Sequence, residues 1–112
     1  MNEAFSFNAN GECENPHTDR YYTLGNEVDV CTAYSEKLQR WLAGYRFRWG
    51  DDGYASPCIE NARNTHYKTQ NAARCAVLDL ALKEFKSRGA STAIIDKLLA
   101  ARIRSSEGLY PK

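Results

Sequence analysis

The sequence lacks long apolar runs and common enzyme motifs, and it has only two histidines. Its apolar stretches, such as residues 75–82 with Asp79 in the middle, are shorter than the ~20 consecutive apolar residues that cross a bilayer. No apolar run follows a basic N-terminus, so we expect no signal peptide and a cytoplasmic location. The sequence contains no glycine-rich phosphate loop, no HExxH and no GxSxG motif. These absences predict a protein that is not an enzyme and that has no membrane partner.

Close cysteine pairs are also missing. The four cysteines, at positions 13, 31, 58 and 75, form no CxxC pair, whereas zinc ribbons need two such pairs to surround the ion. Cys13 and His17 are the only cysteine and histidine that stand close together in the sequence. We therefore expect no metal and no cofactor. We expect Cys31, Cys58 and Cys75 to be reduced thiols that pack as small apolar side chains.

The 112 residues, 43% of them hydrophobic and 26% charged, suit a single domain. Residues 1–20 are rich in Asn, Gly and Glu, which predicts an arm or an edge segment with little regular structure. We expect antiparallel strands between residues 28 and 59 and two helices between residues 69 and 104.

Alternation of residue types predicts the strands. From Val28 to Tyr34 every second residue is a good strand former, which is the period of a half-buried strand. Residues 40–49, RWLAGYRFRW, show the same period, and Gly44 within them suggests a bulge. The sequence GDDG at residues 50–53 is typical of a turn, so residues 45–59 are predicted to form a β-hairpin with a return strand over residues 54–59.

Further along the chain the apolar residues follow the period of helices. Thr69 is a suitable N-cap for a helix over about residues 70–87. Gly89 predicts the end of that helix, and Ser91 or Thr92 can cap a second helix that ends near Arg104. The predicted fold class is therefore α+β, a small antiparallel sheet of three to four strands packed against two C-terminal helices.

Charge is distributed unevenly along the chain. Residues 1–30 contain six carboxylates and one arginine, a net charge of −5 in a chain whose net charge is +1. Carboxylates can take the place of phosphates in a basic groove of a partner, and tyrosine rings add rigid contact area. The same carboxylates can instead pair with the basic remainder of the fold. The predicted partner-binding surface, which we call the acidic lobe, consists of Glu12, Glu14, Asp19, Tyr21, Tyr22, Glu27 and Asp29, extended by Asp51 and Asp52.

The alternative is a nucleic-acid-binding surface. Arginines alternate with aromatic residues in YRFRW at positions 45–49, as they would on a strand that binds nucleic acid by ion pairing and stacking. Period two places the arginines and the aromatics on opposite faces, so the buried face decides which of them is available. The predicted basic set is Arg46, Arg48, Arg63, Lys68 and Arg74, with Lys97, Arg102 and Arg104 as further members.

Residues 41–82 carry two segments, YRFRWGDDGYASPC and TQNAARCAVLDLAL, that resemble a hairpin-then-helix module of phage and plasmid accessory proteins. The end of this region also looks like the last part of a double-stranded RNA-binding domain, although only Lys68 and Arg74 stand where that family has a lysine cluster. In size and lack of motifs the chain is similar to phage inhibitors of bacterial defence, including anti-CRISPR proteins.

These resemblances imply a non-enzymatic binding protein of a phage or mobile element. It would block a nucleic-acid-binding surface of a host protein or ribonucleoprotein complex, for example a CRISPR effector. A nucleic-acid-binding accessory domain is the alternative function. The seven tyrosines and the basic second helix leave self-association as a third possibility.

Overall fold

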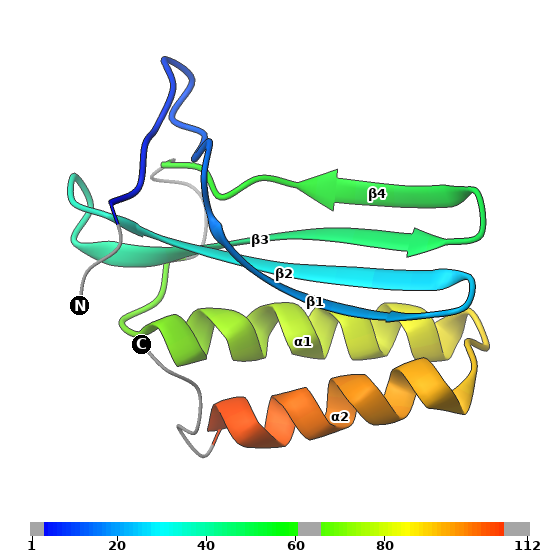
Figure 1. Ribbon diagram of the computed structural model, residues 1–112. Helices are drawn as coiled ribbons and strands as arrows, with labels where there is room; N and C mark the ends of the chain where they lie inside the picture. The colour runs from blue at the N-terminus through cyan, green and yellow to red at the C-terminus, as the bar shows by residue number, and fades with distance from the viewer. Residues whose placement is uncertain (1–3, 61–65, 107–112) are drawn as a thin grey trace.

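The computed structural model describes residues 4–60 and 66–106 and has the predicted α+β fold. The strands form one antiparallel sheet in the order β1-β2-β3-β4, and both helices cover the same face of it (Figure 1). We call the other face the open face. The elements are β1 (His17–Thr23), β2 (Asn26–Ser35), β3 (Arg40–Trp49), β4 (Asp52–Ser56), α1 (Gln70–Ser87) and α2 (Thr92–Ser106).

Local signals set the ends of the helices. The Thr69 hydroxyl accepts a hydrogen bond of 3.0 Å from the Ala72 amide, which confirms the predicted N-cap of α1. Gly89 follows α1 with a φ of 67°, a left-handed conformation that glycine adopts without strain. The second helix ends at Ser106, two residues beyond the predicted Arg104. Within the described residues, no helix is long and apolar enough to span a bilayer.

The strand β1 corrects the expectation of little regular structure in residues 1–20. Its residues His17–Arg20 pair with β2 from Thr32 to Asp29. Side chains in β1 alternate between half-buried and exposed, but most of them are polar on both faces. The period-two signal of apolar residues is therefore absent from the sequence, and the pairing with β2 decides the structure.

The β3–β4 hairpin is tighter than predicted. Trp49 pairs with Asp52, so the turn contains only Gly50 and Asp51. Gly50 has a φ of 62°, which suits the first central position of a two-residue hairpin turn. The return strand was predicted to extend to residue 59, but β4 ends at Ser56, so residues 57–59 do not belong to it.

Gly44 does not form the expected bulge. Its pairing with Cys31 continues the regular register of β2 and β3. Instead, residues 56–58 cross the sheet so closely that a Cβ on Gly44 would lie 2.7 Å from the Cys58 amide nitrogen. Gly44 is therefore needed for a close backbone approach.

The main core lies between the sheet and the helices. Phe47 is fully buried and contacts Phe85 edge to face, with ring centroids 5.8 Å apart. Around this contact pack Val28, Val30, Val77, Leu78, Ala81, Leu82, Ile94, Leu98 and Ala101.

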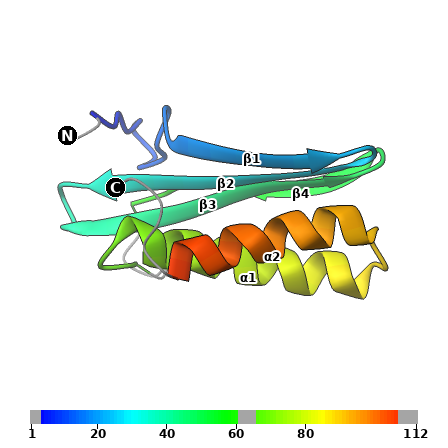
Figure 2. The same ribbon diagram turned by 60° about the horizontal axis from the view of Figure 1, so that its bottom comes forward.

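A second, smaller core lies on the open face. Here the N-terminal arm, residues 4–16, folds over one end of the sheet on the side away from the helices (Figure 2). Cys13 and Cys58 join Ala33 and Leu42 in this core. The remainder of the open face has no such cover from the described residues.

Candidate functional site

The register of the sheet places two rows of side chains on the uncovered part of the open face. Tyr45, Phe47 and Trp49 pack against the helices, so their neighbours on β3 point the other way. One row is Arg20, Asp29, Arg46 and Ala55, and the next is Tyr22, Glu27, Arg48 and Gly53.

Arg46 and Arg48 are exposed on this face. The alternation of residues 45–49 left open which face of β3 is buried, and the structure shows that it is the aromatic face. Because the rings of Tyr45, Phe47 and Trp49 support the helices, they do not form a platform on which bases could stack.

The acidic side chains of β2 on this face interact with an arginine of β1. Arg20 donates to both carboxylate oxygens of Asp29, at 2.9 and 3.3 Å, and its Nε lies 3.8 Å from Glu27. Asp29 is only 5% exposed. Among the described residues, neither Arg46 nor Arg48 forms an ion pair within 4 Å. The unbalanced positive charge of the open face therefore lies on β3, next to β4.

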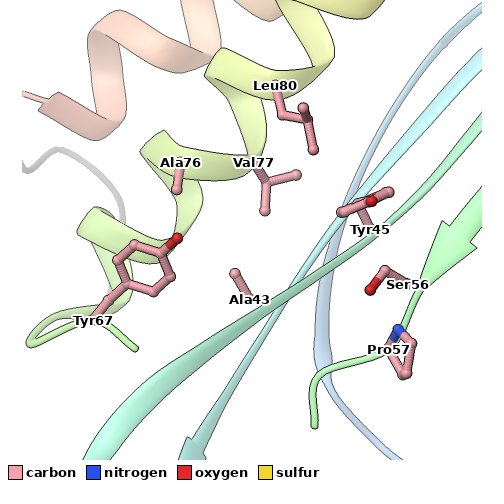
Figure 3. A pocket seen from close by; sticks show the side chains of 8 residues that line it. All are labelled: Ala43, Tyr45, Ser56, Pro57, Tyr67, Ala76, Val77 and Leu80. Atoms are coloured by element: carbon pink, nitrogen blue, oxygen red, sulfur yellow. The ribbon is translucent and has the colours of Figure 1, made fainter. Parts of the chain in front are cut away.

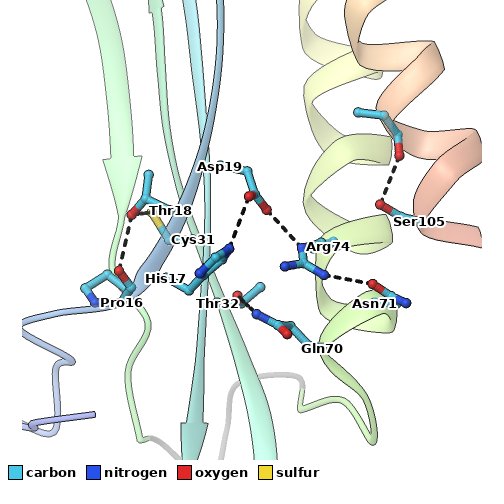
Figure 4. Close-up of polar contacts among 11 residues, drawn as sticks. Pro16, His17, Thr18, Asp19, Cys31, Thr32, Gln70, Asn71, Arg74 and Ser105 are labelled. Atoms are coloured by element: carbon cyan, nitrogen blue, oxygen red, sulfur yellow. Dashed lines mark hydrogen bonds and ion pairs between the residues drawn. The ribbon is translucent and has the colours of Figure 1, made fainter. Parts of the chain in front are cut away.

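The acidic lobe is not one surface. The Asp19 carboxylate accepts a hydrogen bond of 2.9 Å from Arg74 Nε and contacts His17, on the helix-covered side (Figure 4). Tyr21 packs against the main core. Asp19, Tyr21 and Asp29 therefore hold the fold together.

The remaining acidic residues lie at opposite ends of the sheet. Glu12 and Glu14 belong to the N-terminal arm, where Glu12 accepts a hydrogen bond from Asn8. Asp51 and Asp52 lie at the β3–β4 turn, at the far end of the strands (Figure 1).

The predicted basic set is also divided. Arg74 has a side chain that is 2% exposed and paired with Asp19, so it is not available to a phosphate, contrary to the prediction. Lys68 and Arg104 are exposed, whereas Arg63 lies outside the described residues. On α2, Lys97 donates to the backbone oxygen of Tyr22 and Arg102 pairs with Asp79. Arg46 and Arg48 are the members that share the open face.

Two turns meet at one end of the sheet and form a surface that the sequence did not indicate as a unit. The Gly50 amide donates a hydrogen bond of 2.7 Å to the Gly25 carbonyl, which holds the β1–β2 and β3–β4 turns together. Tyr22 is 63% exposed and Leu24 is fully exposed. We define the turn surface as Tyr22, Leu24, Glu27, Asp51 and Asp52. A hollow of about 170 Å³ beside it is lined by Tyr22, Glu27 and Arg48, among others.

A groove of about 200 Å³ opens between α1 and β3, and sequence analysis gave no sign of it. Ala43 and Tyr45 form its floor on the sheet, and Val77 and Leu80 line it from the helix (Figure 3). It exists because β4 ends at Ser56 and the chain then crosses to the open face at Gly44.

The thiols of Cys13, Cys31 and Cys58 show no sign of activation. Burial raises the pKa of Cys13, Cys31 and Cys58, whereas a reactive thiolate requires a lowered pKa. Cys58 is buried as predicted, while Cys31 and Cys75 are half-buried. In the part of the chain that the structure describes, no three His, Cys, Asp or Glu side chains are arranged to hold a metal ion.

Fold and surface together define a small α+β domain with a four-stranded antiparallel meander, a helical layer on one face and a partly bare, charged second face. Comparisons of the chain with protein family models, with curated proteins and with solved structures found no match.

Proposed function

We propose that this chain is a non-enzymatic binding protein that contacts a partner protein through the turn surface. In its more specific form, the proposal is that the chain comes from a phage or mobile element and inhibits a host nucleoprotein machine. An anti-CRISPR protein that occupies a nucleic-acid-binding surface is the most concrete version.

The exposure of Tyr22 and Leu24 beside three carboxylates carries the proposal. Interfaces are enriched in tyrosine, and exposed apolar side chains that gather in one place mark interaction sites. Asp51 and Asp52, on the adjoining turn, add negative charge beside these anchors, while Glu27 lies 3.8 Å from Arg20 and Lys97 donates to the Tyr22 backbone oxygen. Such a surface suits a basic groove, where its carboxylates would pair with the Lys or Arg side chains that normally hold phosphates.

The experiment is affinity capture from bacterial lysate, with and without nuclease, using matched charge-reversed variants. Asp51→Lys/Asp52→Lys changes the turn surface. Glu12→Lys/Glu14→Lys makes the same change of net charge at the opposite end of the sheet and serves as the control. Asp19 is left unchanged in both variants, because reversing it would place a positive charge against the buried Arg74.

We expect a protein partner that nuclease does not remove and that the Asp51→Lys/Asp52→Lys variant retains at least about tenfold less, a loss of 1.4 kcal/mol or more of binding free energy. The arm variant should retain it as the wild type does. Equal retention by both variants, or a partner lost only from the arm variant, would contradict the proposed surface.

A second function, binding of nucleic acid, is favoured by the exposure of Arg46 and Arg48 on the open face. Phosphate contacts make affinity fall with salt, by about 0.9 log unit per log unit of salt for each duplex phosphate that is neutralised. Arg46→Gln/Arg48→Gln should reduce the salt dependence of duplex binding by roughly two such contacts. Absence of any complex with duplex or single-stranded probes at low salt rejects this function.

A further inference from the structure

The outer edge of β4 is an unpaired strand edge. Within the described residues, β4 pairs only with β3 (Figure 1), and it meets α1 through the hydrogen bond that Tyr54 donates to Glu84 on the helix-covered side. Four of its five residues are exposed. Edge strands of this kind are templates for pairing with another chain unless lysine, proline or a bulge protects them. From Asp52 to Ser56, β4 has neither lysine nor proline.

The register shows which backbone groups point outward. A two-residue hairpin turn closes on a hydrogen-bonded pair, here Trp49 with Asp52, and such pairs recur at every second residue. Asp52, Tyr54 and Ser56 therefore direct their backbone groups toward β3. Gly53 and Ala55 direct their N–H and C=O groups away from the sheet, where an added strand could pair with them.

Small side chains on β4 leave a hollow beside the two arginines. Gly53 lies opposite Arg48, and Ala55 lies opposite Arg46, all on the open face. Residues 51–55 and the two arginines line a hollow of about 270 Å³. A side chain larger than methyl at Ala55 would fill it, whereas a Cβ on Gly53 would clash with the Phe47 carbonyl oxygen.

Arg46 and Arg48 supply the positive charge on the open-face side of this edge. Arg20 already engages Asp29 and Glu27, so the carboxylates of β2 are drawn toward β1. Asp51 and Asp52 also line the hollow, and among the described residues neither pairs with Arg46 or Arg48 within 4 Å.

We infer that the edge of β4 accepts an extended segment of a partner protein as a fifth strand, with carboxylates at alternate positions that pair with Arg46 and Arg48. An added strand would lie two strand spacings from β3, roughly 10 Å. An arginine and a glutamate side chain span that distance together across Gly53 and Ala55. The backbone pairs would supply affinity, and the two arginines would select acidic residues at every second position.

This inference does not rest on the proposed function, because the outward backbone groups of Gly53 and Ala55 and the two arginines lie outside the turn surface. The two can therefore fail separately: changes at Asp51 and Asp52 test the turn surface, and changes at Arg46, Arg48 and Ala55 test the edge.

The test uses dye-labelled synthetic peptides and fluorescence anisotropy with the full chain at low salt. The probe alternates Glu and Thr. One control peptide alternates Lys and Thr, and another, the block peptide, has the composition of the probe in the repeat Glu-Glu-Thr-Thr. The block peptide keeps the charge but never places two carboxylates two residues apart on one face of a strand.

Three variants and one control variant test the selection by charge and the pairing of the backbone. Arg46→Gln/Arg48→Gln removes the selecting charges, and Lys83→Gln/Lys86→Gln on α1 is the control with the same change of net charge. Ala55→Pro removes an outward N–H that β3 does not use. Ala55→Tyr keeps that N–H and fills the hollow, so it replaces Ala55→Pro if the proline variant does not fold.

We expect the alternating Glu peptide to bind more tightly than both control peptides. Arg46→Gln/Arg48→Gln and each Ala55 variant should weaken it at least about tenfold, and the helix control should change it less than about twofold. No binding of the probe, or equal binding of the block peptide, overturns the inference. Binding of an oligonucleotide but not of the probe, or self-association of the chain through β4 in light scattering, also overturns it.

Discussion

Residues that are adjacent in β3 lie on opposite faces of the sheet and differ in burial. Phe47, on the helix-covered face, is fully buried between Tyr45, Tyr54 and Phe85. Arg46 and Arg48, on the open face, remain exposed and form no ion pair among the described residues. One strand therefore supplies the centre of the core and the charge of a binding edge.

The ion pairs on the two faces differ in the exposure of their arginines. Arg74 and Asp19 connect α1 to β1, with the Arg74 side chain 2% exposed. On the open face, Arg20 is 55% exposed while it pairs with Asp29. The comparison suggests that charge on the covered face is structural, and that unpaired charge on the open face is available for recognition. Three predictions test this division, from the largest expected effect to the smallest.

Phe47→Ala should give the largest loss of stability. Removal of a fully buried aromatic side chain costs about 4 kcal/mol, because burial is lost and a cavity remains. The matched change on the open face, Arg46→Ala, should alter the free energy of unfolding by less than about 0.5 kcal/mol. Urea denaturation of both variants measures the difference. Similar losses in the two variants would show that the faces are not divided in this way.

Asp19→Ala should destabilise the fold by about 3 kcal/mol, because the buried guanidinium of Arg74 loses its carboxylate partner. The control is Asp79→Ala, which breaks an Arg–Asp pair of 2.7 Å between exposed side chains of the two helices. That change should cost less than about 1 kcal/mol. Thermal and urea unfolding measure both, and an Asp19 variant as stable as the control would mean that the pair does not hold α1 to the sheet.

The smallest effect concerns Tyr54, on the covered side of β4. Burial, and then the hydrogen bond of 2.8 Å that its hydroxyl donates to Glu84, raise the pKa of Tyr54 to about 12. An unfolded tyrosine titrates near 10. The neutral phenol is therefore favoured in the fold, and its contribution to stability is complete below about pH 10 and is lost as the pH rises toward 12.

Ultraviolet absorbance of the phenolate, followed through alkaline titration, measures this shift. Tyr54→Phe should remove a titration step near pH 12. If that step persists in the variant, the group that titrates there is not Tyr54.

Much of the fold follows from short stretches of sequence. Thr69 and Gly89 bound α1 because capping and helix termination depend on a few neighbouring residues. The alternation in residues 40–49 predicted β3 because a half-buried strand needs period two. Sequence analysis missed β1, whose polar residues carry no such signal and are ordered by pairing with β2.

The candidate surfaces were harder to predict because they depend on contacts between distant residues. Asp19 and Arg74 are far apart in the chain, and both were expected to face a partner. Their ion pair instead removes them from the surface. The turn surface brings together residues from two hairpins through the hydrogen bond between Gly50 and Gly25. No local pattern in the sequence predicts that hydrogen bond.

The sequence by itself determined the fold class, the ends of α1 and the separation of arginines from aromatics on β3, because these depend on local propensity and on side-chain period. Only the tertiary structure decided which face of the sheet the helices cover. It also decided which carboxylates pair inside the fold and why Gly44 must be glycine. Each of these outcomes follows from the packing of segments that are distant in the chain, where burial and close contact outweigh the preference of any single residue.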